Sequence, residues 1–248
     1  MCIAAFAFGP DSSYRLAFAA NRDELHARAT SQAAWWQDTP SVLGGRDRVA
    51  GGGWLAVNRR GWLAAVTNLP QSAPRTFPRS RGELVSGFLT GDRSAAQFAA
   101  DFSDRSADFG PCNLIVWDGV EFHYAATGLE RRRLVPGTHA LGNAPLGSDW
   151  PRVHKAEAGF TAALASDDPE EALLRMLSDR ETVALDSADA ALARRRTEIF
   201  ITDARYGTRS SAVVLITHEG AVTFIERSFG ADGLALGDAR YTFEITKD

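Results

Sequence analysis

The sequence predicts an α+β fold in which helices flank two antiparallel sheets, within a single domain of residues 1–248. Three observations support this class. The chain has 248 residues, of which 45% are hydrophobic, enough for one sizeable core. Strand-like and helix-like segments come in alternating blocks, beginning and ending with strands. Turn residues separate consecutive strand-like segments, which is typical of antiparallel pairing, and separate blocks of helices predict layers over the sheets.

The first third of the chain is predicted to be β. Residues 2–8 and 15–21 are apolar runs, and a Gly-Pro-Asp turn lies between them. Farther along, residues 54–58 and 62–68 flank an Arg-Arg-Gly turn. Apolar segments on both sides of a short turn are a hairpin signal, so the segments of each pair are expected to lie side by side.

Helices and further strands are predicted in the rest of the chain. Apolar residues at helical spacing predict helices at 82–89, 94–102, 149–164 and 169–177. Asp149 is a suitable N-cap for the third of these helices, Pro151 falls in its first turn, and acidic residues open the fourth. Strands are predicted at 113–117, 122–127, 198–202, 211–217, 222–229 and 241–246. The polar, Ala-rich stretch 179–196 is expected to be a mobile loop.

Composition excludes several classes of protein. The formal net charge is -4, so nucleic acid is not an expected partner. No apolar run approaches the roughly 18 residues of a transmembrane segment. With only Cys2 and Cys112, a disulfide framework is not expected, and a cytoplasmic location is predicted. The five histidines show no metal-ligand spacing, so neither a metal nor a cofactor is expected. The sequence does not indicate an oligomeric state.

Cys2 is the first candidate catalytic residue. Removal of Met1 is efficient before a small side chain, and it leaves a thiol beside a free α-amine whose unperturbed pKa is roughly 7.7–8.0. A nucleophile with its own adjacent base is one way to activate Ser, Thr or Cys. The alternative is that Met1 stays in place and that Cys2 is a small apolar residue starting a strand.

Polar residues 21–24 form the second candidate group, at the end of the second predicted strand. If the first two strands form a hairpin, this group returns to the neighbourhood of Cys2. There Asp23 would hold an ammonium group or orient a base, and Arg22 would lower the pKa of a thiol. The alternative is an ordinary polar strand end with an internal ion pair.

Seven blocks of sequence, in order, span nearly the whole chain. They are MCIAAFAF at 1–8, AANRDE at 19–24, GGGWLAVNRRGWLAAVTN at 51–68, SRGELVSGFL at 80–89, LGNAPLGSDWPRV at 141–153, YGTRSSAVVLI at 206–216 and VTFIERSF at 222–229. Together they resemble the NRDE family, the transport and Golgi organisation 2 family. That family is similar to N-terminal nucleophile hydrolases of the cholylglycine hydrolase, penicillin V acylase and acyl-CoA:aminopenicillanate acyltransferase branch. The resemblance implies a four-layer αββα sandwich and a mature chain that starts with Cys.

The same resemblance implies roles for particular residues. Asn21 and Asp23 match the Asn and Asp of an Arg-Asn-x-Asp motif, but the Arg of the motif falls on Ala20. Two Asn residues of the oxyanion hole match Asn68 and Asn143. A tetrahedral intermediate needs two donors aimed at one oxygen, which a backbone N–H near Asn68 and the Asn143 amide would supply. Taken alone, Asn68 and Asn143 are plain turn residues.

Basic residues outside these motifs are candidates for binding substrate. Asn21, Arg22 and Arg209 are expected to contact it, with Arg209 reaching a carboxylate or a phosphate. The alternative for Arg209 is a place on the rim of a turn. The runs 131–133 and 194–196 are interpreted as solvated faces, with contact to the phosphates of an acyl-CoA as the alternative.

Two functions from different classes fit these residues. The first is an amidohydrolase or acyltransferase that acts on a small-molecule acyl amide or acyl thioester, acyl-CoA included, through an acyl-Cys2 intermediate. The second, which the resemblance to the NRDE family implies, is a carrier with the same fold that binds lipid, acyl-CoA or haem without turnover. The sequence favours the first. Ala20 stands where the motif has an Arg, and this difference favours the carrier.

Overall fold

The computed structural model describes residues 2–10, 12–71, 73, 75–182 and 196–246, and these residues fall into two compact units. Unit 1 comprises Met1–Ala27, Pro136–Gly142 and Leu146–Thr242, and unit 2 comprises Arg28–Val135, Asn143–Pro145 and Phe243–Asp248. Each unit contains an antiparallel sheet with helices packed on one of its faces. The predicted class, α+β with two antiparallel sheets, is therefore confirmed. The single domain of residues 1–248 stays a prediction.

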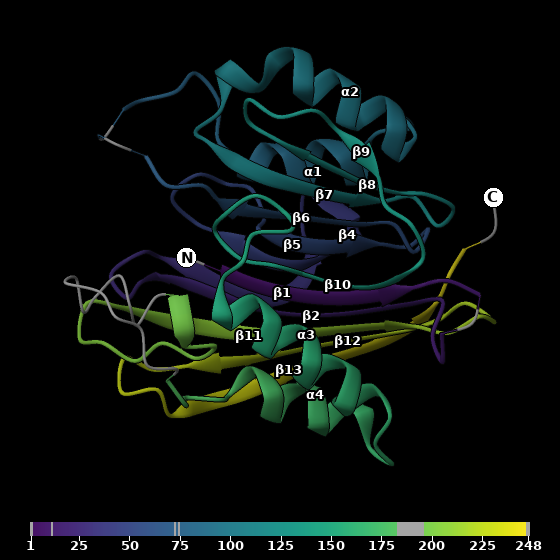
Figure 1. The fold of residues 1–248 in the computed structure, drawn as a ribbon. Coiled ribbons are helices and arrows are strands. Elements are labelled where there is room, and N and C mark those ends of the chain that lie inside the picture. The colour runs from purple at the N-terminus through teal and green to yellow at the C-terminus, as the bar shows by residue number, and fades with distance from the viewer. Residues whose placement is uncertain (1, 11, 72, 74, 183–195, 247–248) are drawn as a thin grey trace. The chain divides into compact units, whose positions relative to one another are not determined.

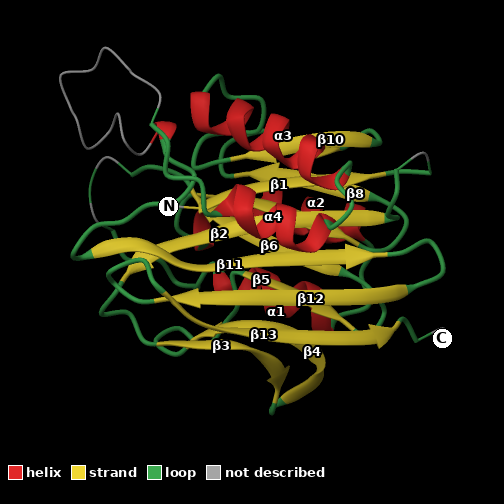
Figure 2. Ribbon diagram, turned by 90° about the horizontal axis from the view of Figure 1, so that it is seen from below, coloured by secondary structure: helices red, strands yellow, loops and turns green. Residues whose placement is uncertain are grey.

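The sheet of unit 1 has six strands, in the order β10-β1-β2-β11-β12-β13 (Figure 2). Their bounds are β1 Cys2–Phe8, β2 Leu16–Leu25, β10 Gly137–Leu141, β11 Tyr206–Ile216, β12 Ala221–Phe229 and β13 Ala235–Glu244. The predicted pairing of the first two strands is confirmed. Its register sets Cys2 opposite Arg22 and Ile3 opposite Asn21. Residues 21–24 thus return to the beginning of the chain.

Helices α3 (Pro151–Leu164) and α4 (Pro169–Leu177) cover one face of this sheet (Figure 1). Asp168 caps α4, because its side chain accepts a hydrogen bond from the backbone N–H of Glu171. Odd-numbered residues of β1, such as Ile3 and Ala5, pack with residues of both helices in one hydrophobic cluster. Side chains alternate between the faces of a strand, so Cys2 lies on the face of β1 that points away from the helices.

The sheet of unit 2 has seven strands, in the order β3-β4-β5-β6-β7-β8-β9. Their bounds are β3 Thr30–Trp36, β4 Thr39–Asp47, β5 Leu55–Asn58, β6 Leu63–Asn68, β7 Cys112–Trp117, β8 Phe122–Ala126 and β9 Arg132–Arg133. Helices α1 (Gly82–Thr90) and α2 (Ala95–Arg105) pack against one face, and a 3-10 turn, η1 (Ser106–Asp108), follows α2. Ser94 begins α2 with a capping box, in which its side chain and that of Gln97 each bond the backbone of the other residue.

One predicted strand is wrong and several observed strands were not predicted. Residues 198–202 are not a strand. The strand that follows this apolar segment, β11, already pairs with β2 on one edge and with β12 on the other. The segment therefore cannot pair with β11 as a further strand. Its backbone instead makes isolated hydrogen bonds, such as the one that the Phe200 N–H donates to the carbonyl oxygen of Asp179. Strands β3, β4, β9 and β10 were not predicted, and the last strand is longer than predicted. Of the predicted loop 179–196, residues 183–195 lie outside the described residues.

Candidate active site

Cys2 is a buried thiol at the start of the central hairpin of unit 1. Burial raises the pKa of this thiol above its ordinary value, and the positive charge at the amino terminus is the largest influence that lowers it. The nearby carboxylate of Asp23 also raises the pKa, whereas the Asp23 backbone N–H, which bonds the sulfur, and the charge of Arg22 lower it. The thiol therefore needs a local base or cation to become a nucleophile.

Asp23 is a fully buried carboxylate with two side-chain partners. The hydroxyl of Thr208 donates to Asp23 Oδ1 at 2.7 Å, and Arg152 Nη2 donates to Oδ2 at 3.4 Å. Neither side chain of the Asp23–Arg152 pair is exposed to solvent. Burial raises the pKa of Asp23, and the charges of Arg152 and of the amino terminus act in the opposite direction. The Cys2 thiol and the Asp23 carboxylate are thus electrostatic neighbours.

Arg152 is a site residue that the sequence reasoning missed. It lies in the first turn of α3, 129 residues along the chain from Asp23. A signal was present, because Arg152 falls on the same helical stripe as the buried residues Ala156, Phe160 and Ala163. A charged side chain on an apolar helix face requires a buried partner. In the structure a guanidinium reaches Asp23 from the helix layer, although Ala20 occupies the place of the motif Arg.

Asn21 connects the sheet of unit 1 to its helix layer. Its Nδ2 donates to the carbonyl oxygens of Leu177 at 2.7 Å and Ile199 at 3.0 Å, and Ser211 Oγ donates to its Oδ1 at 2.6 Å. These bonds place Asn21 on the helix-covered face of β2, whereas Arg22 shares the other face with Cys2. The neighbours Asn21 and Arg22 therefore do not point to the same side. The predicted contact between Asn21 and substrate stays a prediction.

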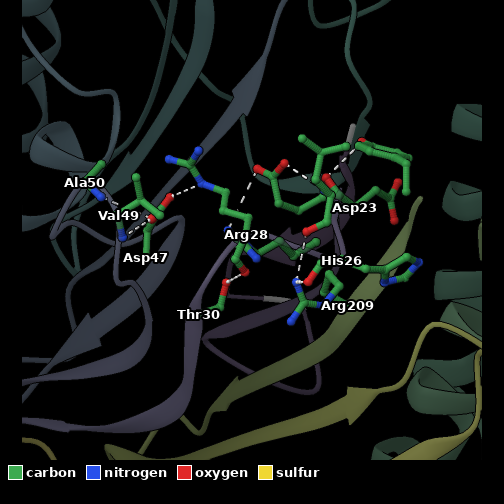
Figure 3. A network of polar contacts seen from close by, with 12 residues as sticks. Asp23, His26, Arg28, Thr30, Asp47, Val49, Ala50 and Arg209 are labelled. Atoms are coloured by element: carbon green, nitrogen blue, oxygen red, sulfur yellow. Dashed lines mark hydrogen bonds and ion pairs between the residues drawn. The ribbon is translucent and has the colours of Figure 1, made fainter. Parts of the chain in front are cut away.

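Two arginines gather at the end of β2. Arg22 is buried, and its Nη2 lies 3.9 Å from Glu24 Oε2. Arg209 lies at an irregularity of β11, and its Nη1 donates to the carbonyl oxygens of Leu25 at 3.0 Å and His26 at 3.2 Å (Figure 3). Burial lowers the pKa of Arg209, as does the charge of Arg22, whereas Glu24 raises it. Glu24 thus lies close enough to both guanidinium groups to offset part of their mutual repulsion.

The two Asn residues predicted for the oxyanion hole lie together within unit 2. Asn68 ends β6, and Asn143 Nδ2 donates to its carbonyl oxygen at 2.7 Å. The segment that carries Asn143 is held by Asn113, whose Nδ2 donates to the carbonyl oxygen of Ala144 at 3.0 Å. Tyr124 in turn donates to Asn113 Oδ1 at 2.8 Å. A buried hydrogen-bonded chain thus fixes the position of the Asn143 side chain.

Cys112 has a different environment from Cys2. It starts β7 and belongs to the apolar cluster between the sheet and helices of unit 2. Burial raises the pKa of its thiol to about 12. Cys112 is therefore a core residue, as buried cysteines commonly are. Within the part of the chain that the structure describes, no helix is long and apolar enough to cross a membrane, and no group of His, Cys, Asp and Glu side chains is placed to hold a metal ion.

The fold is that of the N-terminal nucleophile hydrolases. The structure of the C2A mutant of the conjugated bile acid hydrolase from Clostridium perfringens matches it with a TM-score of 0.53 at 8% identity, over 99% of this chain and 92% of that chain. This likeness concerns the fold alone, to which each unit contributes one antiparallel sheet with its helices.

Residues 1–231 match the Transport and Golgi organisation 2 family model, and the chain belongs to that family. The Transport and Golgi organization protein 2 homolog of Bos taurus is 35% identical, over 94% of this chain and 95% of the relative. The homolog of Homo sapiens is 32% identical, over 99% of both chains.

Proposed function

We propose that the protein is an N-terminal-cysteine amidohydrolase or acyltransferase that cleaves an amide or an acyl thioester through an acyl-Cys2 intermediate. The observation that carries the proposal is the position of the buried Asp23 carboxylate beside the Cys2 thiol, whose sulfur accepts a hydrogen bond from the Asp23 backbone N–H. The proposal includes removal of Met1, which lies outside the described residues. Removal would give Cys2 its own α-amine as a base.

The proposed reaction has two steps. The Cys2 α-amine takes the thiol proton, the sulfur attacks the carbonyl carbon, and the carbonyl π electrons move to oxygen. When this intermediate collapses, the bond from carbon to the leaving nitrogen or sulfur breaks, and the leaving group takes the proton from the α-ammonium. Water or an amine then attacks the thioester, and the thiol leaves with its proton restored.

Asp23 has the proposed role of holding the α-ammonium group in place. A carboxylate does this only while it is ionised, and burial acts against ionisation. The ion pair with Arg152 and the hydrogen bond from Thr208 both favour the ionised form. Arg152 and Thr208 are therefore positioning residues, which act through Asp23.

Asn68 and Asn143 keep their predicted role as oxyanion donors in this proposal. The support is the resemblance to the Asn residues of the hydrolase branch, together with the 2.7 Å hydrogen bond between them. That bond uses one of the two hydrogens of the Asn143 amide. Removing one oxyanion donor costs roughly 100-fold to 1,000-fold in kcat in other enzymes, and a similar loss is expected for Asn143→Ala.

The proposed substrate is a small acyl amide with an anionic group. Arg22 and Arg209 provide two guanidinium groups at the end of β2, which fit a carboxylate or a similar anion. The structural relative is named as a hydrolase of conjugated bile acids, and this supports a small-molecule amide. Asn21, which lies on the opposite face from Arg22, would act on substrate only indirectly.

Intact-mass spectrometry with a p-nitrophenyl ester as the acylating probe tests the proposal. We expect the wild type to lack Met1 and to gain one acyl group. Cys112→Ala should retain this labelling and Cys2→Ala should lose it. A wild-type mass that includes Met1, with no acyl group gained at Cys2, would rule out the self-activated nucleophile. Assays of acyl-CoA and haem binding would then test the predicted carrier.

A further inference from the structure

A polar hollow of about 650 Å³ lies in unit 2, and none of the residues of the proposed reaction line it. Ser103, at the end of α2, and Ser106, which starts η1, line one side of it. His123 of β8 and the loop that leads into the edge strand β9 line the rest. This hollow is therefore formed by elements that unit 2 holds together by itself.

His123 is the buried polar group of this hollow. Its Nε2 lies 2.9 Å from Glu121 Oε2, and the other oxygen of Glu121 pairs with Arg133 Nη1 at 3.1 Å. The remaining ring nitrogen, Nδ1, is buried and has no hydrogen-bond partner among the described residues. A buried polar atom without a partner is destabilising, so such atoms usually face a water molecule or a ligand.

The charges around the hollow favour an anion as that ligand. Arg131, Arg132 and Arg133 line it together with the carboxylate of Glu130, and Glu121 pairs with Arg133 from beside it, so the arginines outnumber the carboxylates. Arg133 is set opposite His123 in the sheet, so the two side chains share a face. Arg132 is set opposite Tyr124 and stacks over its ring at 5.3 Å. Arg133 therefore lies on the same face as His123, and Arg131, which also lines the hollow, is the next arginine whose guanidinium no ring stacking occupies among the described contacts.

We propose that this hollow binds the phosphate group of a phosphorylated small molecule. In the proposed complex, the guanidinium groups of Arg131 and Arg133 donate to the phosphate oxygens, and the ring of His123 lines the hollow beside them. Glu121 holds the other ring nitrogen and so orients the imidazole. The hydroxyl of Ser106 is a further donor. The hollow is much larger than a phosphate ion, which leaves room for the organic part of the ligand.

NMR of 15N-histidine-labelled protein tests the proposal. The probe is inorganic phosphate, titrated against sodium chloride at equal ionic strength, and His123→Gln assigns the resonances. We expect a saturable change in the 15N shifts of the His123 ring as phosphate is added. Phenyl phosphate should bind more tightly than inorganic phosphate, because its ring occupies the remaining space.

Two exposed arginines of unit 2 provide a matched pair of variants. Arg131→Ala should weaken phosphate binding about tenfold, the effect of losing one charge-assisted hydrogen bond. Arg48→Ala removes an exposed arginine outside the hollow and should leave binding unchanged. Absence of a saturable change at His123, or equal weakening by both variants, would overturn the proposal. Cys2→Ala should bind phosphate like the wild type, which keeps this test independent of the proposed reaction.

Discussion

Replacing Arg152 by Met should destabilise the protein strongly, because it removes a buried guanidinium group from the buried carboxylate of Asp23. Removing one partner of a buried pair costs about 3–5 kcal/mol. Both side chains are fully buried, so solvent does not screen the pair. The contact is 3.4 Å long and Thr208 still donates to Asp23, which places the expected loss near the lower limit, at about 3 kcal/mol.

The loss in Arg152→Met should depend on pH. Burial already raises the pKa of Asp23, and removal of Arg152, the largest opposing charge, raises it further. Between the ordinary carboxyl pKa of about 3.9 and the raised folded-state pKa, the folded protein binds more protons than the unfolded chain. Stability therefore falls as pH rises through the folded-state pKa. The destabilisation should be larger at pH 7 than near pH 4, where protonation relieves the buried charge.

Urea unfolding at both pH values measures this effect, with tryptophan fluorescence as the probe. The matched control is the double variant Arg152→Met, Asp23→Asn, which removes the charge and keeps an acceptor for Thr208. It should recover at least half of the lost free energy at pH 7. A loss below about 1 kcal/mol, equal losses at the two pH values, or no recovery in the double variant would refute the reasoning about this pair.

Three further predictions concern other parts of the structure. Gly52→Ala should destabilise by about 1–3 kcal/mol in urea unfolding, because a Cβ there would lie 2.3 Å from the backbone carbon of Gly82. Gly87→Ala, where a Cβ would make only ordinary contact with the ring of Phe98, should stabilise by about 0.5–1 kcal/mol. A reversed order of the two variants would contradict the packing of α1. Asn21→Ala should lower the urea midpoint more than Ser211→Ala does, because it takes the Asn21 donor away from two buried carbonyl groups, at a cost of about 1–3 kcal/mol each. Equal midpoints would count against the role of Asn21 in joining the sheet to the helix layer. In the Cys2→Ala protein, iodoacetamide should alkylate Cys112 only after unfolding, because the Cys112 thiol is buried and has a pKa of about 12. Alkylation of the folded protein, detected by mass spectrometry, would disprove the assignment of Cys112 to the core.

The sequence predicted the central hairpin because its signal is local. Two apolar runs around a Gly-Pro-Asp turn are sufficient to pair β1 with β2, and this pairing brings residues 21–24 back to Cys2. Helices α1 to α4 were predicted for the same reason, since apolar spacing and caps lie within each segment. The half-exposed strands β3 and β4 lack a regular alternating pattern, so no local signal separated them from loops.

What could not be predicted depends on contacts between distant segments. The buried partner of Asp23 comes from α3, and the partners of Asn21 come from the end of α4 and the segment at Ile199. The segment 198–202 resembles a strand in composition, but whether it becomes one depends on a vacant sheet edge, which tertiary structure decides. The placement of Asn21 and Arg22 on opposite faces follows from alternation, once the pairing is known.

The most direct test of the central claim compares two forms of the protein that differ by one residue before Cys2. Protease cleavage of a fusion protein can yield one form that begins at Cys2 and one that carries an extra Gly ahead of it. Both keep the thiol, but only the first has the α-amine on Cys2. We expect the p-nitrophenyl ester to acylate Cys2 in the first form and not in the second. Equal acylation of both forms would contradict the claim that the α-amine of Cys2 activates its own thiol.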